Sequence, residues 1–221
     1  MNATNTLARM GAGFADPTHG SQQTFRMLLE AMSLPGRPRT LPDAATAGLV
    51  TTQADMAPPV GIGMAAALLT LLDADTPVLL AGAMAGEATR AWIRFHTSAR
   101  PATIVDTPTI AAAFARDVTP ALWERLALGS DEAPQDGATL LVEVDGLADR
   151  QAADTSDGIA LTLQGPGIET VQALVVSGLP DAFWRWRQEL ATAMPRGVDL
   201  VLVHGTTLAA IPRSSRLSRK D

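Results

Sequence analysis

The sequence predicts an α/β fold, with a mixed sheet flanked by helices, in a single domain spanning 1–221. Helix-like segments alternate with short apolar strand-like segments, which is the pattern of a sheet with helices packed on it. With 221 residues, 47% of them hydrophobic and 18% charged, the chain can bury a substantial core and lacks the composition of a disordered protein. We see no internal repeat and no linker long enough to divide the domain, and we expect mobile tails at 1–13 and 214–221.

The first predicted helix covers residues 21–33, because Ser21 can cap its N-terminus and Pro35 and Gly36 stop it. Its apolar residues recur at helical spacing, which indicates one buried face. That face is expected to carry Phe25, Leu28, Leu29 and Met32. Residues 37–60 are rich in proline and threonine, so we expect a long surface connection there.

The segment 62–72 is apolar on every side, which predicts a buried helix. A turn at 73–76 then leads into a strand over 77–81. Another helix is predicted over 85–96. We expect its inner face to carry Ala88, Trp92 and Phe95, and its outer face to carry Arg90 and Arg94.

The rest of the chain continues the alternation of helices and strands. Two further helices are predicted over 119–128, where Thr119 is the expected cap, and over 180–194. Residues 145–158 are polar and contain two Asp-Gly turn signals, which indicates a loop or hairpin connection. The predicted strands are 103–105, 111–114, 139–144, 159–163, 198–203 and 207–211.

Composition closes several functional classes. The chain has no cysteine, and its one lysine is Lys220, so a thiol nucleophile, a cysteine-bound iron–sulfur cluster and an internal Schiff-base lysine are excluded. A net charge of −6 argues against broad nucleic-acid binding, and the basic group at Arg213, Arg216, Arg219 and Lys220 is expected to lie in a solvated tail. The apolar stretch 57–72 is too short and too interrupted to span a membrane, and no signal core is evident, so we expect a cytoplasmic protein.

The strongest candidate for a ligand site is Arg94-Phe95-His96-Thr97 at a predicted helix end. A guanidinium, an imidazole and a hydroxyl could bind a phosphate or phosphonate there. The alternative is a cationic last turn that stabilises the C-terminus of the helix, with Phe95 in the core. Arg94 and His96 are therefore the predicted ligand-binding residues, and no catalytic residue, metal ligand or cofactor is predicted.

Other motifs have a functional and a structural interpretation. Gly61-Ile62-Gly63 lacks the third glycine and the lysine of nucleotide loops, which favours a helix entry with close backbone packing. Asp73 and Asp75 have no histidine near them in sequence, which favours a turn over a metal site. Gly165-Pro166-Gly167 could form an anion nest, but the proline lacks an amide and favours a tight turn. For Trp184 and Trp186, interface and core positions are both open.

A set of short blocks occurs in a definite order along the chain. They are SQQTFR (21–26), AMSLPG (31–36), DADTPV (73–78), RFHT (94–97), GATL (137–140), LQGPGI (163–168), PRGVDL (195–200) and AIPR (210–213). None of these blocks is diagnostic alone, but the ordered set resembles the PhnH family, a subunit of the bacterial carbon–phosphorus lyase system.

The resemblance implies a function in phosphonate catabolism. Family members act with PhnG, PhnI and PhnL to replace the adenine of ATP with a phosphonate, which gives ribose 1-methylphosphonate 5-triphosphate, and PhnJ is a further partner. The family fold resembles the large domain of transferases that depend on pyridoxal phosphate (PLP), without PLP, and isolated members form homodimers. The resemblance therefore implies an accessory subunit of a transferase complex. Two alternatives remain at this point, an autonomous small-molecule enzyme with an anion site near Arg94 and His96, and a purely structural dimeric scaffold.

Overall fold

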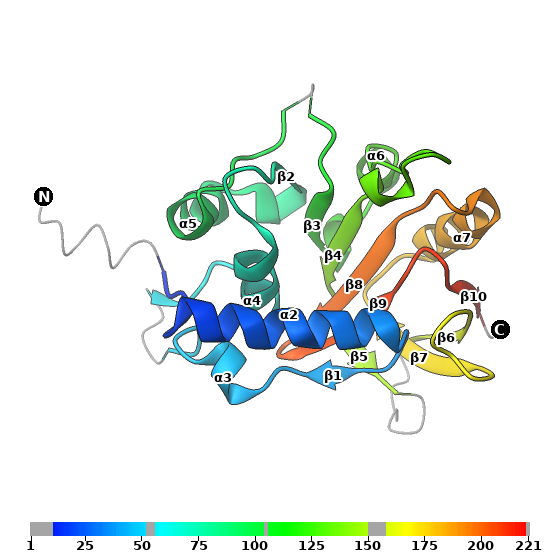
Figure 1. Ribbon diagram of the computed structural model, residues 1–221, viewed down its shortest axis with the longest axis horizontal. Helices are drawn as coiled ribbons and strands as arrows, with labels where there is room; N and C mark the ends of the chain where they lie inside the picture. Colours follow the sequence, from blue (N-terminus) through cyan, green and yellow to red (C-terminus); the bar gives the residue numbers. More distant parts are fainter. Residues whose placement is uncertain (1–10, 52–55, 104–105, 150–157, 220–221) are drawn as a thin grey trace, which may run out of the picture.

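The computed structural model describes residues 11–51, 56–103, 106–149 and 158–219. Its main sheet has six strands in the order β1-β9-β8-β4-β3-β2 (Figure 1). The strands β2, β3, β4 and β8 are parallel, with β2 at one edge of the sheet, and β9 and β1 continue the sheet beyond β8 in antiparallel pairing. The strands are β1 (Arg39–Thr40), β2 (Val78–Leu80), β3 (Ile110–Phe114), β4 (Thr139–Glu143), β8 (Asp199–His204) and β9 (Thr207–Ile211).

A second, antiparallel sheet has the order β10-β6-β7-β5. Its strands are β5 (Gly146–Ala148), β6 (Ile159–Gln164), β7 (Gln172–Ser177) and β10 (Arg216–Arg219). The sequence analysis missed β7, which follows the Gly-Pro-Gly turn, and left 145–148 as a connection. The mixed α/β class is confirmed, with two sheets where one was expected.

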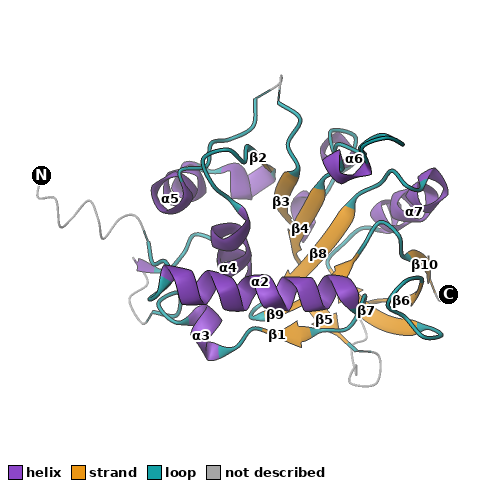
Figure 2. Cartoon of the chain, in the orientation of Figure 1, coloured by secondary structure: helices purple, strands orange, loops and turns teal. Residues whose placement is uncertain are grey.

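Helices cover both faces of the main sheet, and the core forms two hydrophobic clusters separated by it (Figure 2). Alternate residues of a strand enter opposite clusters, as the two-residue period of a strand requires. In β4, Leu140 and Val142 enter one cluster while Leu141 enters the other. The cluster that contains Leu141 is closed by α2 (Pro17–Ser33), α3 (Asp43–Thr46), α4 (Ile62–Leu71) and α5 (Glu87–Thr97). The other is closed by the second sheet with α6 (Pro120–Trp123) and α7 (Asp181–Leu190).

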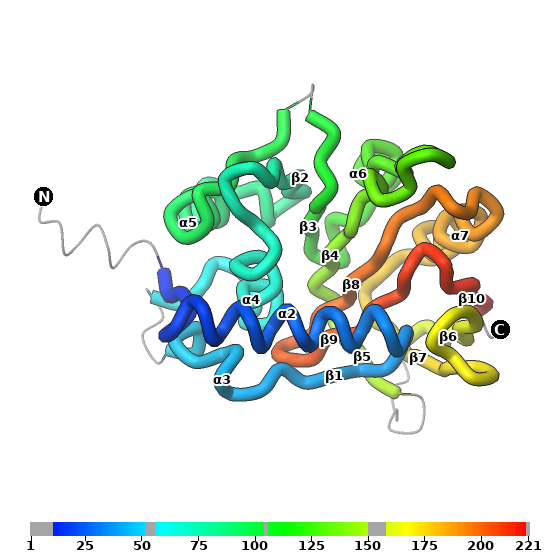
Figure 3. Tube along the Cα trace, viewed as in Figure 1, coloured from blue at the N-terminus to red at the C-terminus, as the bar shows by residue number. Residues whose placement is uncertain are grey.

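The first helix, α2, begins earlier than predicted and buries a different face from the one predicted. Asp16, not Ser21, caps it by accepting a hydrogen bond from the His19 backbone N–H. Leu28 is buried as expected, but Phe25 is 48% exposed and Leu29 is 54% exposed. Part of the buried face is instead built from small residues, which let the helix lie close to its neighbours. The trace in Figure 3 shows α2 running alongside β9, from the far end of the chain.

The buried face of α5 also differs from the prediction, and the buried face of α7 includes a charged side chain. On α5, Trp92 is buried with its neighbours at helical spacing, Thr89 and Ile93, whereas Ala88 and Phe95 are exposed. On α7, buried residues are Phe183, Trp184 and Arg187. Trp186 is half-buried and Met194, beyond the helix, is exposed. The prediction failed because it followed apolar residues alone, while these helices bury polar side chains as well.

Three other expectations need correction. The connection 37–60 is partly buried, because it contains β1 and α3 and places Leu41, Ala45 and Leu49 in the core. The predicted helix over 119–128 is helical only at α6, Pro120–Trp123. The expected C-terminal tail from 214 instead forms β10, which pairs with β6. Most of the strand predicted over 103–105 lies outside the described residues.

The buried helix α4 and the strands β2, β3, β4, β8 and β9 are confirmed. In the part of the chain that the structure describes, no helix is both long and apolar enough to cross a lipid bilayer.

Candidate functional site

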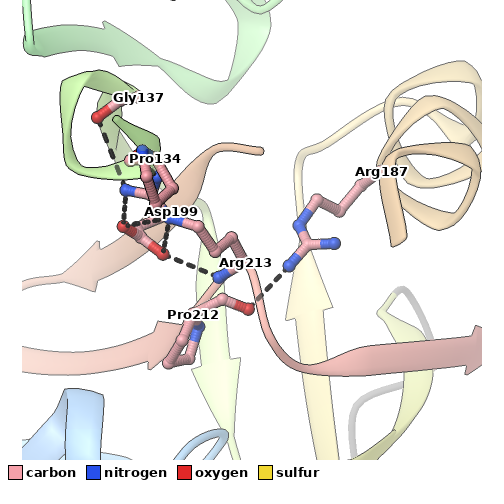
Figure 4. A network of polar contacts seen from close by, with 6 residues as sticks. All are labelled: Pro134, Gly137, Arg187, Asp199, Pro212 and Arg213. Atoms are coloured by element: carbon pink, nitrogen blue, oxygen red, sulfur yellow. Dashed lines mark hydrogen bonds and ion pairs between the residues drawn. The ribbon is translucent and has the colours of Figure 1, made fainter. Parts of the chain in front are cut away.

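A network of polar contacts lies at the amino end of β8, where Asp199 faces Arg213 from the segment after β9 (Figure 4). The Arg213 backbone N–H donates to Asp199 Oδ1 at 2.6 Å, and its Nε and Nη2 donate to Asp199 Oδ2 at 3.1 and 2.5 Å. The guanidinium also donates to the carbonyl oxygens of Pro134 and Gly137. One arginine therefore joins three segments that are distant in sequence.

Beside this network, Arg187 of α7 is almost fully buried, with 1% of its surface exposed. Its Nη2 donates to the carbonyl oxygens of Pro212 at 2.7 Å and Ser215 at 3.4 Å (Figure 4). Burial lowers the pKa of the guanidinium to about 10, and the charge of Asp199 acts in the opposite direction. Arg187 thus stays cationic at neutral pH and fastens α7 to the chain after β9. The Asp199 carboxylate and the Arg213 guanidinium are occupied by one another and by backbone groups, which indicates a structural role, whereas Arg187 Nε is buried without a hydrogen-bond partner among the described residues.

The opposite, carboxyl end of the parallel strands carries a second group of polar side chains, Arg116, Glu143 and His204, which we call the carboxyl-end cluster. Glu143 ends β4 and His204 ends β8, while Arg116 follows β3. Glu143 Oε2 accepts a hydrogen bond of 3.0 Å from the Gly61 backbone N–H at the start of α4. His204 Nδ1 lies 3.0 Å from the Val144 carbonyl oxygen, so that nitrogen carries the proton of this hydrogen bond.

The electrostatics of this cluster centre on Glu143. Burial raises the pKa of its carboxyl above the ordinary value, while the Gly61 N–H and the positive charges of Arg116 and His204 act in the opposite direction. Arg116 is exposed, with its guanidinium 4.5 Å from the centroid of the Phe114 ring. The cluster therefore combines the Glu143 carboxyl, whose pKa is raised, with the accessible cation of Arg116. In open α/β sheets, ligands bind at the carboxyl ends of the parallel strands.

Arg94 and His96, the predicted ligand-binding pair, lie on different parts of α5. Arg94 is exposed and lines a surface hollow of about 600 Å³ together with Arg90 and Phe95. His96 Nε2 lies 3.3 Å from the Gly11 carbonyl oxygen, and its ring is 5.3 Å from that of Trp92. Residues two apart on a helix do not face each other. The structure does not bring these two side chains to one ligand position.

The glycine and aspartate motifs have structural roles. A side chain at Gly63 would collide with the Gly205 carbonyl oxygen and Val203, so this glycine allows close packing at the entry of α4. Asp73 Oδ1 accepts hydrogen bonds from the Asp75 backbone N–H and the Thr76 hydroxyl, which forms a turn and lowers the pKa of Asp73. Over the residues that the structure describes, no group of three or more His, Cys, Asp or Glu side chains could hold a metal ion.

Comparison with known proteins agrees with the blocks noted in the sequence. The model of the family described as "Bacterial phosphonate metabolism protein (PhnH)" matches residues 12–218. The chain belongs to the PhnH family. It is 33% identical over 207 residues, or 94% of both chains, to the "Alpha-D-ribose 1-methylphosphonate 5-triphosphate synthase subunit PhnH" of Rhizobium meliloti (strain 1021). It is also 39% identical over 93 residues to the "Putative C-P lyase subunit protein HtxG" of Stutzerimonas stutzeri, a match that covers 42% of this chain and 44% of that protein.

Blocks that carried the PhnH resemblance meet in space at structural positions. The network around Asp199 and Arg213 joins residues of the PRGVDL and AIPR blocks to Gly137 of the GATL block. Gly167 of the LQGPGI block lies against Ser33 and Pro35 of the AMSLPG block. These PhnH blocks therefore hold the fold together, and the residues of the carboxyl-end cluster lie outside all of the blocks.

The sequence analysis missed Arg116, Glu143 and Arg187. Glu143 and Arg116 could have been found, because each lies at or just after the end of a predicted parallel strand, where the carboxyl ends align. Arg187 gave no signal, since a single arginine on an amphipathic helix is normally exposed.

Proposed function

We propose that this chain is an accessory subunit of a carbon–phosphorus lyase complex, needed for the transfer of phosphonate onto ATP with loss of adenine. The complex would be of the ribose 1-methylphosphonate 5-triphosphate synthase type, in organic phosphonate catabolism. The observation that carries this proposal is the match to the PhnH family over residues 12–218, with 33% identity to a named synthase subunit over 94% of both chains.

Surface features support the role of a subunit. Phe25 and Leu29 on α2 and Phe95 on α5 are each about half exposed, and exposed apolar side chains mark contact surfaces. We propose PhnG, PhnI, PhnJ and PhnL as partners, and a homodimer for the isolated cytoplasmic protein. Arg94 stays in the proposal as a contact for a ligand or partner because it lines an open hollow.

The proposal includes a fold related to the large domain of PLP-dependent transferases, without PLP. The four adjacent parallel strands with helices on both faces support it. The one lysine of the chain, Lys220, is the penultimate residue, and an aldimine with PLP requires a lysine positioned inside the site.

The test is deletion of the gene in its bacterium, followed by growth with methylphosphonate as the sole phosphorus source. We expect growth to be lost, to be restored by the wild-type gene, and to be unaffected on inorganic phosphate. Purification of the tagged chain should also recover the other subunits. Normal growth of the deletion strain on methylphosphonate would contradict the proposal.

A further inference from the structure

A hollow of about 370 Å³ opens at the carboxyl end of β2, between the turn η2 (Gly82–Ala85) and α6. Four polar residues line it, namely Arg116, Asp117, Thr119 and Arg125. Its volume falls within the range of small-molecule sites. It also lies at the carboxyl end of the parallel strands, where ligands of α/β proteins bind.

The charges in this hollow favour an anion. The Asp117 carboxylate is occupied, because its Oδ2 accepts a hydrogen bond of 2.9 Å from the Ala83 backbone N–H. Asp117 also packs directly against Gly82, where any side chain would overlap its carboxyl carbon. Arg116 and Arg125 are both exposed, and among the described residues neither forms an ion pair with a carboxylate. Two accessible guanidinium groups therefore line this hollow with one carboxylate, which already accepts a backbone hydrogen bond. Outside the hollow, the charge of Arg116 also acts on Glu143.

Arg116 also lines a second hollow, of about 360 Å³, on the side of the second sheet. That hollow has both polar and apolar surface, and its lining includes the apolar side chains of Ile159, Val176, Leu179 and Pro180. Arg116 is therefore the residue that the linings of the two hollows share.

We propose that Arg116 and Arg125 bind the tetrahedral anion of a small phosphate- or phosphonate-bearing molecule, whose organic part occupies the second hollow. A guanidinium presents a planar fork of N–H donors that matches two oxygens of such an anion. The Thr119 hydroxyl adds a donor in the same hollow. Arg116 would act as the shared contact between the charged and apolar parts of the ligand.

The experiment measures binding of inorganic phosphate, methylphosphonate and ATP to the isolated full-length chain by calorimetry at constant ionic strength. The double variant Arg116→Met/Arg125→Met removes both guanidinium groups and keeps the aliphatic length. We expect its affinity for phosphate to fall at least about tenfold, because each charge-assisted hydrogen bond lost is worth that much. The matched control is Arg185→Met, which removes an exposed arginine of α7 away from both hollows.

Three results would overturn the inference: unchanged affinity in the double variant, an equal loss in Arg185→Met, or acetate binding as tightly as phosphate. A loss confined to Arg94→Met would place the anion on α5 instead and would also overturn it. The measurements with methylphosphonate and ATP rest on the proposed function, and they distinguish a phosphonate from a nucleotide phosphate as the source of the anion. The measurement with inorganic phosphate tests the site alone. Phosphate binding at this site together with normal growth of the deletion strain would refute the proposed function and leave the site standing.

Discussion

Replacing Asp199 by alanine tests whether the amino-end network holds the fold together. The carboxylate accepts four hydrogen bonds from Arg213, one from its backbone N–H and three from its guanidinium. The Asp199 and Arg213 side chains are only 12% and 17% exposed. Removing one partner of a buried ion pair leaves the other charge uncompensated, which costs about 3–5 kcal/mol. Because both side chains keep slight exposure, we expect Asp199→Ala to lower the free energy of unfolding by about 3 kcal/mol, at the lower end of that range.

Two further variants separate charge from hydrogen bonding. Asp199→Asn keeps an acceptor for the Arg213 backbone N–H and should cost less, about 2 kcal/mol. A double-mutant cycle with Arg213→Met should show a coupling energy of about 2 kcal/mol, because the two residues share one interaction. The matched control is Asp131→Ala, which breaks the exposed Arg196–Asp131 pair, 47% and 76% exposed, and should cost less than about 1 kcal/mol.

The assay is urea unfolding followed by tryptophan fluorescence, with the midpoint and the slope reported for each variant. Trp123, Trp184 and Trp186 lie in or against the core cluster that this network borders, so their emission follows its loss. If Asp199→Ala and Asp131→Ala cost the same free energy, the claim that burial makes the Asp199–Arg213 pair important is wrong.

Two other predictions follow from the packing and the pKa values. Gly167→Ala should lower stability by about 2 kcal/mol or more in thermal unfolding, because φ is +81° and the added carbon would overlap the Ser33 carbonyl oxygen. The control is Gly205→Ala, which should cost only about 1 kcal/mol, because φ is +58° and the added carbon enters open space. Equal costs for the two variants would contradict the overlap argument. Burial raises the pKa of Glu143 in the folded state, so ionised Glu143 costs stability as the pH rises through that pKa. Glu143→Gln should therefore gain stability relative to the wild type at pH 7 and lose that gain below the unfolded-state pKa of about 4.3, and a pH-independent difference in urea unfolding would refute this.

The strands β2, β3, β4, β6, β8 and β9 and the fully buried helix could be predicted because their patterns are local. The segment α4 is apolar on every side and β8 is a continuous apolar run, so neither requires knowledge of a partner to be placed in the core. The family blocks were also readable, since they are consecutive residues in a fixed order.

Which face of each amphipathic helix is buried was decided only by the tertiary structure. Phe25 and Leu29 are exposed on α2 although they fit an apolar stripe, and Phe95 is exposed on α5. Arg187 can be buried because carbonyl oxygens of the segment after β9 accept hydrogen bonds from its guanidinium. Such placements depend on what packs against a helix, and that partner comes from elsewhere in the chain.

The candidate sites depend on tertiary packing for the same reason. By itself, the sequence determined the α/β class, the chemistry excluded by the absence of cysteine and of an internal lysine, and the order of the family blocks. Only the tertiary structure showed that His96 lies against the Gly11 carbonyl while Arg94 lines a surface hollow, and that Arg116 and Arg125 line one hollow. Local patterns fix the elements, whereas a site requires side chains from separate elements to be brought together by packing.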